Sequence, residues 1–199
     1  MRTIDPRKHE ERRREILQAA KRCFARDGLR GASISEICAE AKISPGHLYH
    51  YFESKEAIVA AMTEATMAEA DTHLDLMAQS DDPIGTLVAK IESTRAKHSD
   101  AAHFLVFDML AEAGHNPSIA KILRDHSQAL RSRFAGYLRA GQQGGKIDPS
   151  LDADLAAAVL MSAVEGVKAM RIRDPKLSKA GLGEHLTILI GRFLTPAQK

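Results

Sequence analysis

Tryptophan is absent from this 199-residue sequence, and phenylalanine and tyrosine bring the aromatic content to only 5%. Alanine and leucine dominate the apolar residues, which make up 44% of the chain. Both favour helices, whereas the aromatic residues that favour strands are sparse. The composition therefore predicts an all-α protein with enough apolar surface to bury a core.

Cysteine is nearly absent as well. Cys23 and Cys38 are too few for a disulfide framework, and both fall on apolar helical stripes. We interpret them as small buried residues in a reducing compartment. The N-terminus is charged from its first residues, and no apolar run approaches the length of a membrane span. These features predict a cytoplasmic protein with no membrane contact.

The net charge of +2 is unevenly distributed along the chain. Residues 1–55 contain twelve Lys/Arg and eight Asp/Glu, a net of +4, whereas the remainder holds sixteen and eighteen, a net of −2. A basic head on a mildly acidic body suggests a polyanionic partner for the head. The alternative is that these charges only solvate helix surfaces.

The N-terminal part reads as a series of short helices. Polar residues 1–14 are expected to form a loose tail, followed by a helix that Asp27-Gly28 ends. Ser33 and Glu36 have the spacing of a capping box, and the helix they open ends near Lys42. Ser54 caps a further helix that is expected to run to about Met67.

Between these elements, Ser44-Pro45 opens a helix expected to extend to Phe52. Leu48 and Phe52 are four residues apart and face inward, and Gly46, His47 and His50 lie opposite. Two helices joined by a tight turn form a helix-turn-helix candidate, whose second helix enters the major groove of DNA. Ordinary helical structure with surface His and Tyr residues is the alternative.

The chemistry of this unit suits phosphate and base contacts. Tyr hydroxyls and His nitrogens can donate to phosphate oxygens, and Gly46 allows close approach of the backbone. Lys55 lies at a helix N-terminus, where the amide groups already favour anions. Several such anchors would position the reading helix and make DNA binding dependent on salt.

The stretch 24–56, which reads FARDGLRGASISEICAEAKISPGHLYHYFESKE, resembles the DNA-binding domain of the TetR/AcrR family of transcriptional regulators. Its most specific part is LYHYF followed by SKE, and the resemblance covers about residues 12–62. Beyond it, only the length and the helical layout are similar. The resemblance implies residues 1–62 as the DNA-binding domain, residues 63–199 as a helical ligand-binding and dimerisation domain, and a repressor that a small-molecule effector releases from a double-stranded operator.

The same resemblance assigns expected DNA contacts to the start of the second helix, to the reading helix and to the residues after it: Ser33, Ser35, Pro45, Gly46, His47, Tyr49, His50 and Lys55. One position departs from the family pattern. Lys42 stands where members often have glycine, in the turn between the second and third helices. A left-handed Lys42 would cost on the order of 1 kcal/mol.

The remaining sequence also reads as helix, with start signals at Asp82-Pro83 and Asn116-Pro117 and a long helix over about 117–142. The last two helices are expected at about 152–172 and 180–194. The first of these is apolar nearly all round, so both its sides are expected to be buried. The family implies a homodimer through these two helices; a central helix in a monomer is the alternative.

An effector pocket is implied by the family, with candidate residues Phe104, Phe107, Met109, Met161 and Glu165. Glu165 interrupts an apolar helix face, so it either binds a ligand or emerges into solvent. The histidines lack metal-ligand spacing, and no nucleophile–base pair or phosphate-binding glycine loop is apparent. We therefore expect neither an enzyme nor a cofactor; a DNA-binding protein without an effector stays open as a further alternative.

Overall fold

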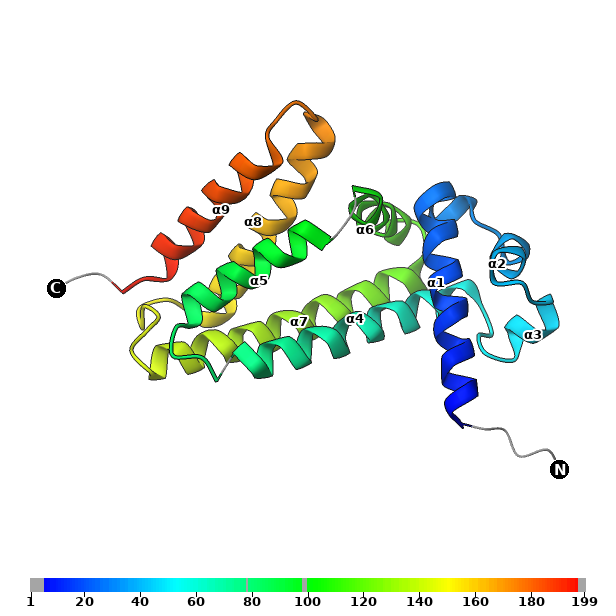
Figure 1. The fold of residues 1–199 in the computed structure, drawn as a ribbon, viewed down its shortest axis with the longest axis horizontal. Coiled ribbons are helices and arrows are strands. Elements are labelled where there is room, and N and C mark those ends of the chain that lie inside the picture. The colour runs from blue at the N-terminus through cyan, green and yellow to red at the C-terminus, as the bar shows by residue number, and fades with distance from the viewer. Residues whose placement is uncertain (1–5, 78, 98–99, 197–199) are drawn as a thin grey trace. The chain divides into compact units, whose positions relative to one another are not determined.

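The computed structural model describes residues 6–77, 79–97 and 100–196, and over these ranges the chain forms nine helices and no strand (Figure 1). The all-helical prediction is therefore confirmed. The helices are α1 (Pro6–Gly31), α2 (Ile34–Ala41), α3 (Pro45–Tyr49), α4 (Lys55–Met77), α5 (Pro83–Lys97), α6 (Asp100–Ala113), α7 (Pro117–Gln143), α8 (Ala153–Arg173) and α9 (Lys179–Leu194).

The chain divides into two compact units. The first comprises Met1–Thr66 and Ser99–His126, and the second comprises Met67–His98 and Ser127–Lys199. Because α4 and α7 each run from one unit into the other, the first unit combines α1–α3 with α6 and parts of α4 and α7. The predicted division after residue 62 falls within α4, and the unit's second segment comes from the part assigned to the C-terminal domain.

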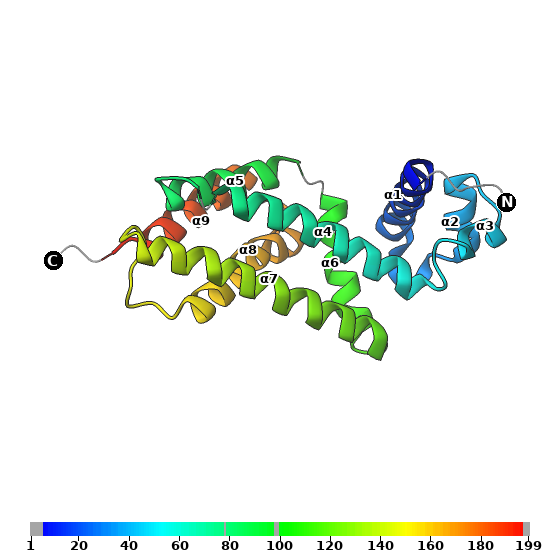
Figure 2. The ribbon, with the colours of Figure 1, turned by 90° about the horizontal axis from the view of Figure 1, so that it is seen from below.

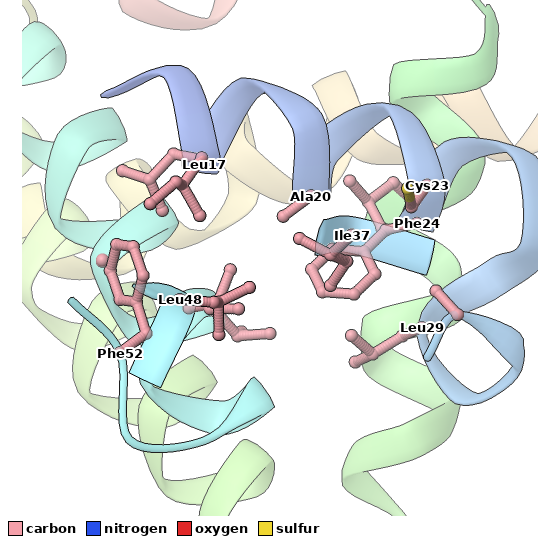
Figure 3. Packing of buried hydrophobic residues seen from close by; sticks show 14 of the residues in the cluster. Leu17, Ala20, Cys23, Phe24, Leu29, Ile37, Leu48 and Phe52 are labelled. Carbon is pink, nitrogen blue, oxygen red and sulfur yellow. The ribbon is translucent and has the colours of Figure 1, made fainter. Parts of the chain in front are cut away.

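The core of the first unit forms beneath α1. Figure 3 shows Leu17, Ala20 and Phe24 of α1 directed toward Ile37, Leu48 and Phe52. Both cysteines are buried in this core, as predicted. Three side chains from later in the sequence complete it: Leu105 and Met109 of α6 and Ile119 of α7.

The start of α1 corrects the expectation of a loose tail over residues 1–14, because the helix begins at Pro6. Proline is favoured in the first turn of a helix. Two ion pairs at helical spacing support the following turns, Arg12 with Glu15 and Arg14 with Glu10. A polar composition had suggested disorder, but the pairing of its charges favours a helix.

Gly28 interrupts α1 where the sequence predicted its end. Its φ of 76° and ψ of 163° are not helical, and the chain then forms one more turn to Gly31. This backbone conformation is essentially restricted to glycine. The extra turn redirects the chain toward α2.

Helices α2 and α3 begin as predicted. Ser33 caps α2 through a capping box with Glu36, and the Ser44 hydroxyl accepts a hydrogen bond from the His47 amide at the start of α3. However, α3 ends at Tyr49 rather than at Phe52. Phe52 is still buried, because the turn after α3 carries it back to the core.

Helix α4 is longer than expected, ending at Met77 instead of near Met67. The extension contains neither glycine nor proline before Asp82-Pro83, and its Ala, Glu, Met and Leu residues are good helix formers. The apolar periodicity weakens along this extension, which is why the sequence pattern suggested an earlier end.

In the second unit, α9 packs against α5 and α8 (Figure 2). Arg133 of α7 pairs with Asp71 of α4 at 2.6 Å. The buried Tyr137 hydroxyl donates to the carbonyl of Pro83 at 2.5 Å, and burial raises the pKa of Tyr137 to about 12. These contacts join the ends of α4 and α7 to the start of α5.

The last helix divides its leucines between two sides. Leu186 is 4% exposed and packs in the second core with Ile190 and Leu194, whereas Leu189 is 50% exposed. The apolar side chains of α9 therefore face both the chain's own core and the outer side of the helix.

Candidate nucleic-acid interface

The predicted reading helix presents nearly all of its polar side chains outward. Leu48 is the one buried residue of α3, and the exposed residues over 44–50 are Ser44, Pro45, Gly46, His47, Tyr49 and His50. Nothing within the described part of the chain lies within 4 Å of the place a Cβ on Gly46 would occupy. The segment is thus held from one side and open on the other, as a helix entering a DNA groove requires.

The start of α2 lies in the same unit. The Ser33 hydroxyl accepts from the Glu36 amide at 3.2 Å and donates to the Glu36 carboxylate at 2.8 Å. Hydrogen bonds from the Ser33 amide and hydroxyl lower the pKa of Glu36. Ser35, on the first turn of α2, is exposed. The capping box thus fixes the helix end, and Ser35 is the freer of the two predicted contacts.

The turn between α2 and α3 is left-handed at Lys42, with φ 55° and ψ 49°. Within the described residues, Lys42 is the one non-glycine position with a positive φ. The amides of Lys42 and Ile43 donate to carbonyls of the last turn of α2, the latter to Cys38 at 2.9 Å. This closes α2 in the manner of a glycine cap, although lysine occupies the position.

Lys55 is tied to the segment between α1 and α2. Its ammonium donates to the carbonyl oxygens of Leu29 at 2.8 Å and of Ala32 at 3.3 Å. Lys55 is half-buried, not freely extended into solvent. The sequence predicted its place at a helix N-terminus but not this contact, because the carbonyls lie more than twenty residues earlier.

Two contacts join α6 and α7 to this region, and sequence reasoning missed both. The Asp108 carboxylate of α6 accepts from the Leu29 amide, directly after Gly28. Asn116, before α7, donates to Glu56 of α4 at 3.0 Å. Hydrogen bonds from its own amide and from Asn116 lower the pKa of Glu56. No local pattern reveals such pairs, since their partners are 60 or more residues apart.

A further group missed from the sequence is aromatic. Tyr51, after α3, contacts the rings of His47 and His50 from the reading helix and of His9 from α1. His9 belonged to the segment expected to be a tail, so no helical face was assigned to it.

The predicted effector residues are divided between the two units. Met109 is buried in the first core, and Phe107 is half-buried on the same helix. Met161 packs against the second core, and Glu165 is exposed on α8. The side chain of Phe104 lies outside the described residues. An effector role for these residues stays a prediction.

The two helices predicted to dimerise carry exposed apolar side chains. On α8, Leu155 is 67% exposed and Val159 is 52% exposed. Met170 of α8, Leu177 after it, and Ile188 and Leu189 of α9 are exposed as well. Exposed apolar residues gathered on neighbouring elements indicate an interaction surface.

None of the helices in the described ranges is long and apolar enough to cross a membrane.

Two family models match the chain. The model described as "Bacterial regulatory proteins, tetR family" matches residues 16–62, the helix-turn-helix part. The model described as "BetI-type transcriptional repressor, C-terminal" matches residues 93–194. Together they span the segments that carry the reading helix and the exposed apolar face.

The similarity to individual proteins extends over nearly the whole length of this chain. The HTH-type transcriptional regulator UidR of Escherichia coli is 29% identical over 92% of this chain and 93% of its own. The structure of Salmonella enterica GusR has a TM-score of 0.78 and 27% identity, covering 92% of this chain and 95% of its own. The transcriptional regulator FadR of Bacillus subtilis, solved in complex with stearoyl-CoA, shares the fold with a TM-score of 0.77 and 18% identity, covering 91% and 98%.

Proposed function

Because the chain belongs to the TetR family of bacterial regulatory proteins and is a ligand-responsive, DNA-binding transcriptional repressor, we propose that α3 reads its operator. The observation that carries this proposal is the open side of α3: one leucine holds the helix to the core, and the polar side chains face outward. A bacterial operator lies in the cytoplasm, where this protein would act.

Direct base contacts are proposed for the exposed residues at the start of the reading helix. Pro45, Gly46 and His47 would lie where side chains and backbone reach base edges, and His47 carries the ring nitrogens that can discriminate bases. Ser33, Ser35, Tyr49 and His50 are proposed to contact the phosphate backbone or flanking bases.

Lys55 is proposed to serve two partners at once. An ammonium has three N–H donors, and two of those of Lys55 are directed at the carbonyls of Leu29 and Ala32. The third would donate to a phosphate oxygen. Such a lysine anchors the DNA and the segment before α2 together, so that its loss disturbs both.

The repressor is proposed to act as a homodimer through α8 and α9. A second copy is the occupant that suits this face, because Leu155, Val159 and Leu189 are exposed on the same pair of helices that the family uses for dimerisation. Two reading helices would then meet two half-sites of an operator. Residues 63–199 would thus supply the dimer and the effector site, and residues 1–62 would supply the DNA contacts.

The effector is proposed to act through α6. One side of α6 is committed to the first unit, where Leu105 and Met109 pack in the core and Asp108 accepts from Leu29. Its other side is apolar, with Val106 and Leu110 exposed and Phe107 half-buried. A small molecule that binds this apolar side and shifts α6 would displace the segment before α2, which changes the affinity for DNA. FadR was solved in complex with stearoyl-CoA, so a protein of this fold binds a molecule with a long acyl chain.

The test is a selection from a random duplex library with the full-length protein. We expect it to enrich a two-fold symmetric sequence. With that duplex, His47→Ala should relax the preference at particular base pairs, at about 1–3 kcal/mol for a good contact. Failure to enrich any sequence would contradict the proposed function.

Lys55 is tested on the same duplex. Lys55→Gln keeps N–H donors for the carbonyls but removes the charge, so it should lower the salt dependence of binding by about one unit with little effect on melting. Lys55→Ala should lower both the salt dependence and the melting temperature. An unchanged salt dependence in both variants would show that Lys55 acts only within the protein.

A further inference from the structure

The first two turns of α1 carry a face that the proposed DNA contacts do not use. His9 and Arg13 are four residues apart, so they lie on one side of the helix, in line with the buried Leu17. The His9 ring stacks on Tyr51, with ring centroids 4.6 Å apart and planes 28° apart. The Arg13 guanidinium lies 5.3 Å from the centroid of the Phe52 ring. Both residues therefore contact the segment that comes directly after the reading helix.

Tyr51 is also in contact with the reading helix itself. Its ring centroid lies 5.5 Å from that of His47 and 5.8 Å from that of His50, the latter nearly perpendicular at 89°. His9 lies 6.4 Å from His50. A displacement of Tyr51 would therefore disturb two residues proposed to meet DNA, and His9 is the neighbour that lies flat against Tyr51.

The reading helix needs such support because it is short. α3 has five residues and one buried side chain, so its orientation depends on the contacts of the residues after it. We propose that His9 is a positioning residue for sequence recognition: by stacking on Tyr51, it holds the C-terminal end of α3 at the angle at which His47 and His50 meet DNA. The inference rests on the proposed reading role of α3.

The proposal predicts a loss of specific affinity in His9→Ala. An aromatic pair of this kind contributes an energy that corresponds to about a 2- to 12-fold change in binding. We expect the affinity for the selected duplex to fall by that factor, with little change for a random duplex, because a tilted reading helix loses base contacts before it loses phosphates. The melting temperature should change little, since His9 lies in a half-exposed terminal part of α1.

His9→Phe is the conservative variant, because it keeps a flat ring without nitrogen or charge. It should bind the selected duplex within about twofold of the unmodified protein. His115→Ala, which removes an exposed histidine from the same unit, serves as the control and should have no effect. In a Tyr51→Leu background, His9→Ala should cause no further loss, because the stacking partner is already gone.

Two results would overturn the proposal. If His9→Phe loses as much affinity as His9→Ala, and the random duplex is weakened equally, His9 contacts phosphate itself. If His9→Ala leaves the affinity for the selected duplex unchanged, the stack does not position α3. Both results require that the unmodified protein selects a sequence, so they are distinguishable from failure of the proposed function, in which no sequence is selected.

Discussion

The two compact units of this protein expose different kinds of side chain on their helices. In the first unit, the reading segment buries Leu48 and exposes polar residues such as Ser44 and His47. In the second unit, α8 buries Ala157 and Leu160 while it exposes Leu155 and Val159 on its other side. The reading segment thus presents hydrogen-bonding groups outward, and the outer side of α8 presents hydrocarbon.

The two kinds of exposed surface suit partners of different chemistry. A surface of hydroxyls, imidazoles and helix starts suits the phosphates and base edges of DNA. A surface of leucine and valine on two adjacent helices suits another apolar surface, and association there is stabilised by the removal of that surface from water. Specificity is therefore expected from the first unit, and most of the association energy of a dimer from the second.

The largest expected effect tests which side of α9 is internal. Leu186→Ala should lower the free energy of unfolding by about 2–5 kcal/mol, because it leaves a cavity in the second core. Leu189→Glu, three residues away on the exposed side, should leave a folded protein that sediments as a monomer. Urea unfolding and analytical ultracentrifugation measure the two effects. A dimeric Leu189→Glu protein would place the interface elsewhere.

The next effect concerns the first unit, where α6 meets the segment after Gly28. Gly28→Ala should lower the free energy of unfolding by about 1–3 kcal/mol, because its backbone conformation is strained for any residue with a side chain. The added Cβ would also lie 3.3 Å from the Asp108 carboxylate. Gly46→Ala is the matched control, since its Cβ has open space; it should leave stability nearly unchanged. Equal melting of the two variants would contradict the strain assigned to Gly28.

At Lys42, in the same unit, the reverse substitution to glycine should raise stability. Lys42→Gly should raise the free energy of unfolding by about 1 kcal/mol through relief of the left-handed conformation, less the entropy that glycine gains in the unfolded chain. Lys42→Ala, which keeps the strain and removes the charge, should leave stability close to that of the unmodified protein. If both variants are stabilised alike, the charge of Lys42 rather than its backbone is the cause.

The smallest effect concerns His126, at the end of the first unit's second segment. Its Nδ1 is buried without a hydrogen-bond partner among the described residues, and burial lowers the pKa of this imidazole from its ordinary value of 6.5. Below pH 6.5 the unfolded chain therefore takes up a proton that the folded chain does not, so stability falls as the pH falls toward the lowered pKa. His126→Leu should lack this decline. Denaturation curves between pH 5 and pH 7.5 measure the difference between the two proteins.

Local signals predicted the helix starts of the first unit well. The capping box at Ser33, the Ser44 cap and the break at Gly28 are all found where the sequence placed them, because each depends on residues within one turn. Cap and turn chemistry is a property of a few adjacent residues. The left-handed backbone at Lys42 was raised only through the resemblance to a family whose members often have glycine at this position.

The features that the sequence did not predict depend on contacts between residues far apart in the chain. The contacts of Lys55 with Leu29 and of Asp108 with the Leu29 amide join elements that no periodicity relates. The exposure of Leu189 beside the buried Leu186 could not be read from the sequence, because apolar positions on a helix do not show which of them face the chain's own core. Likewise, the stack of His9 on Tyr51 could not be read from a segment whose charge pattern resembles a tail.

Helices α4 and α7 belong to both units, and this limits where the chain can be divided when a hybrid regulator is built from it. A head cut after Thr66 would lack Leu105, Met109 and Ile119, which belong to its core but lie in α6 and α7. If residues 1–66 alone were fused to the C-terminal part of another regulator, the apolar side chains beneath α1 would lose the α6 and α7 residues that pack against them. A graft that is to keep its operator preference should therefore carry the matching side chains of α6 and the first turns of α7 with the head, including Asp108 and Asn116.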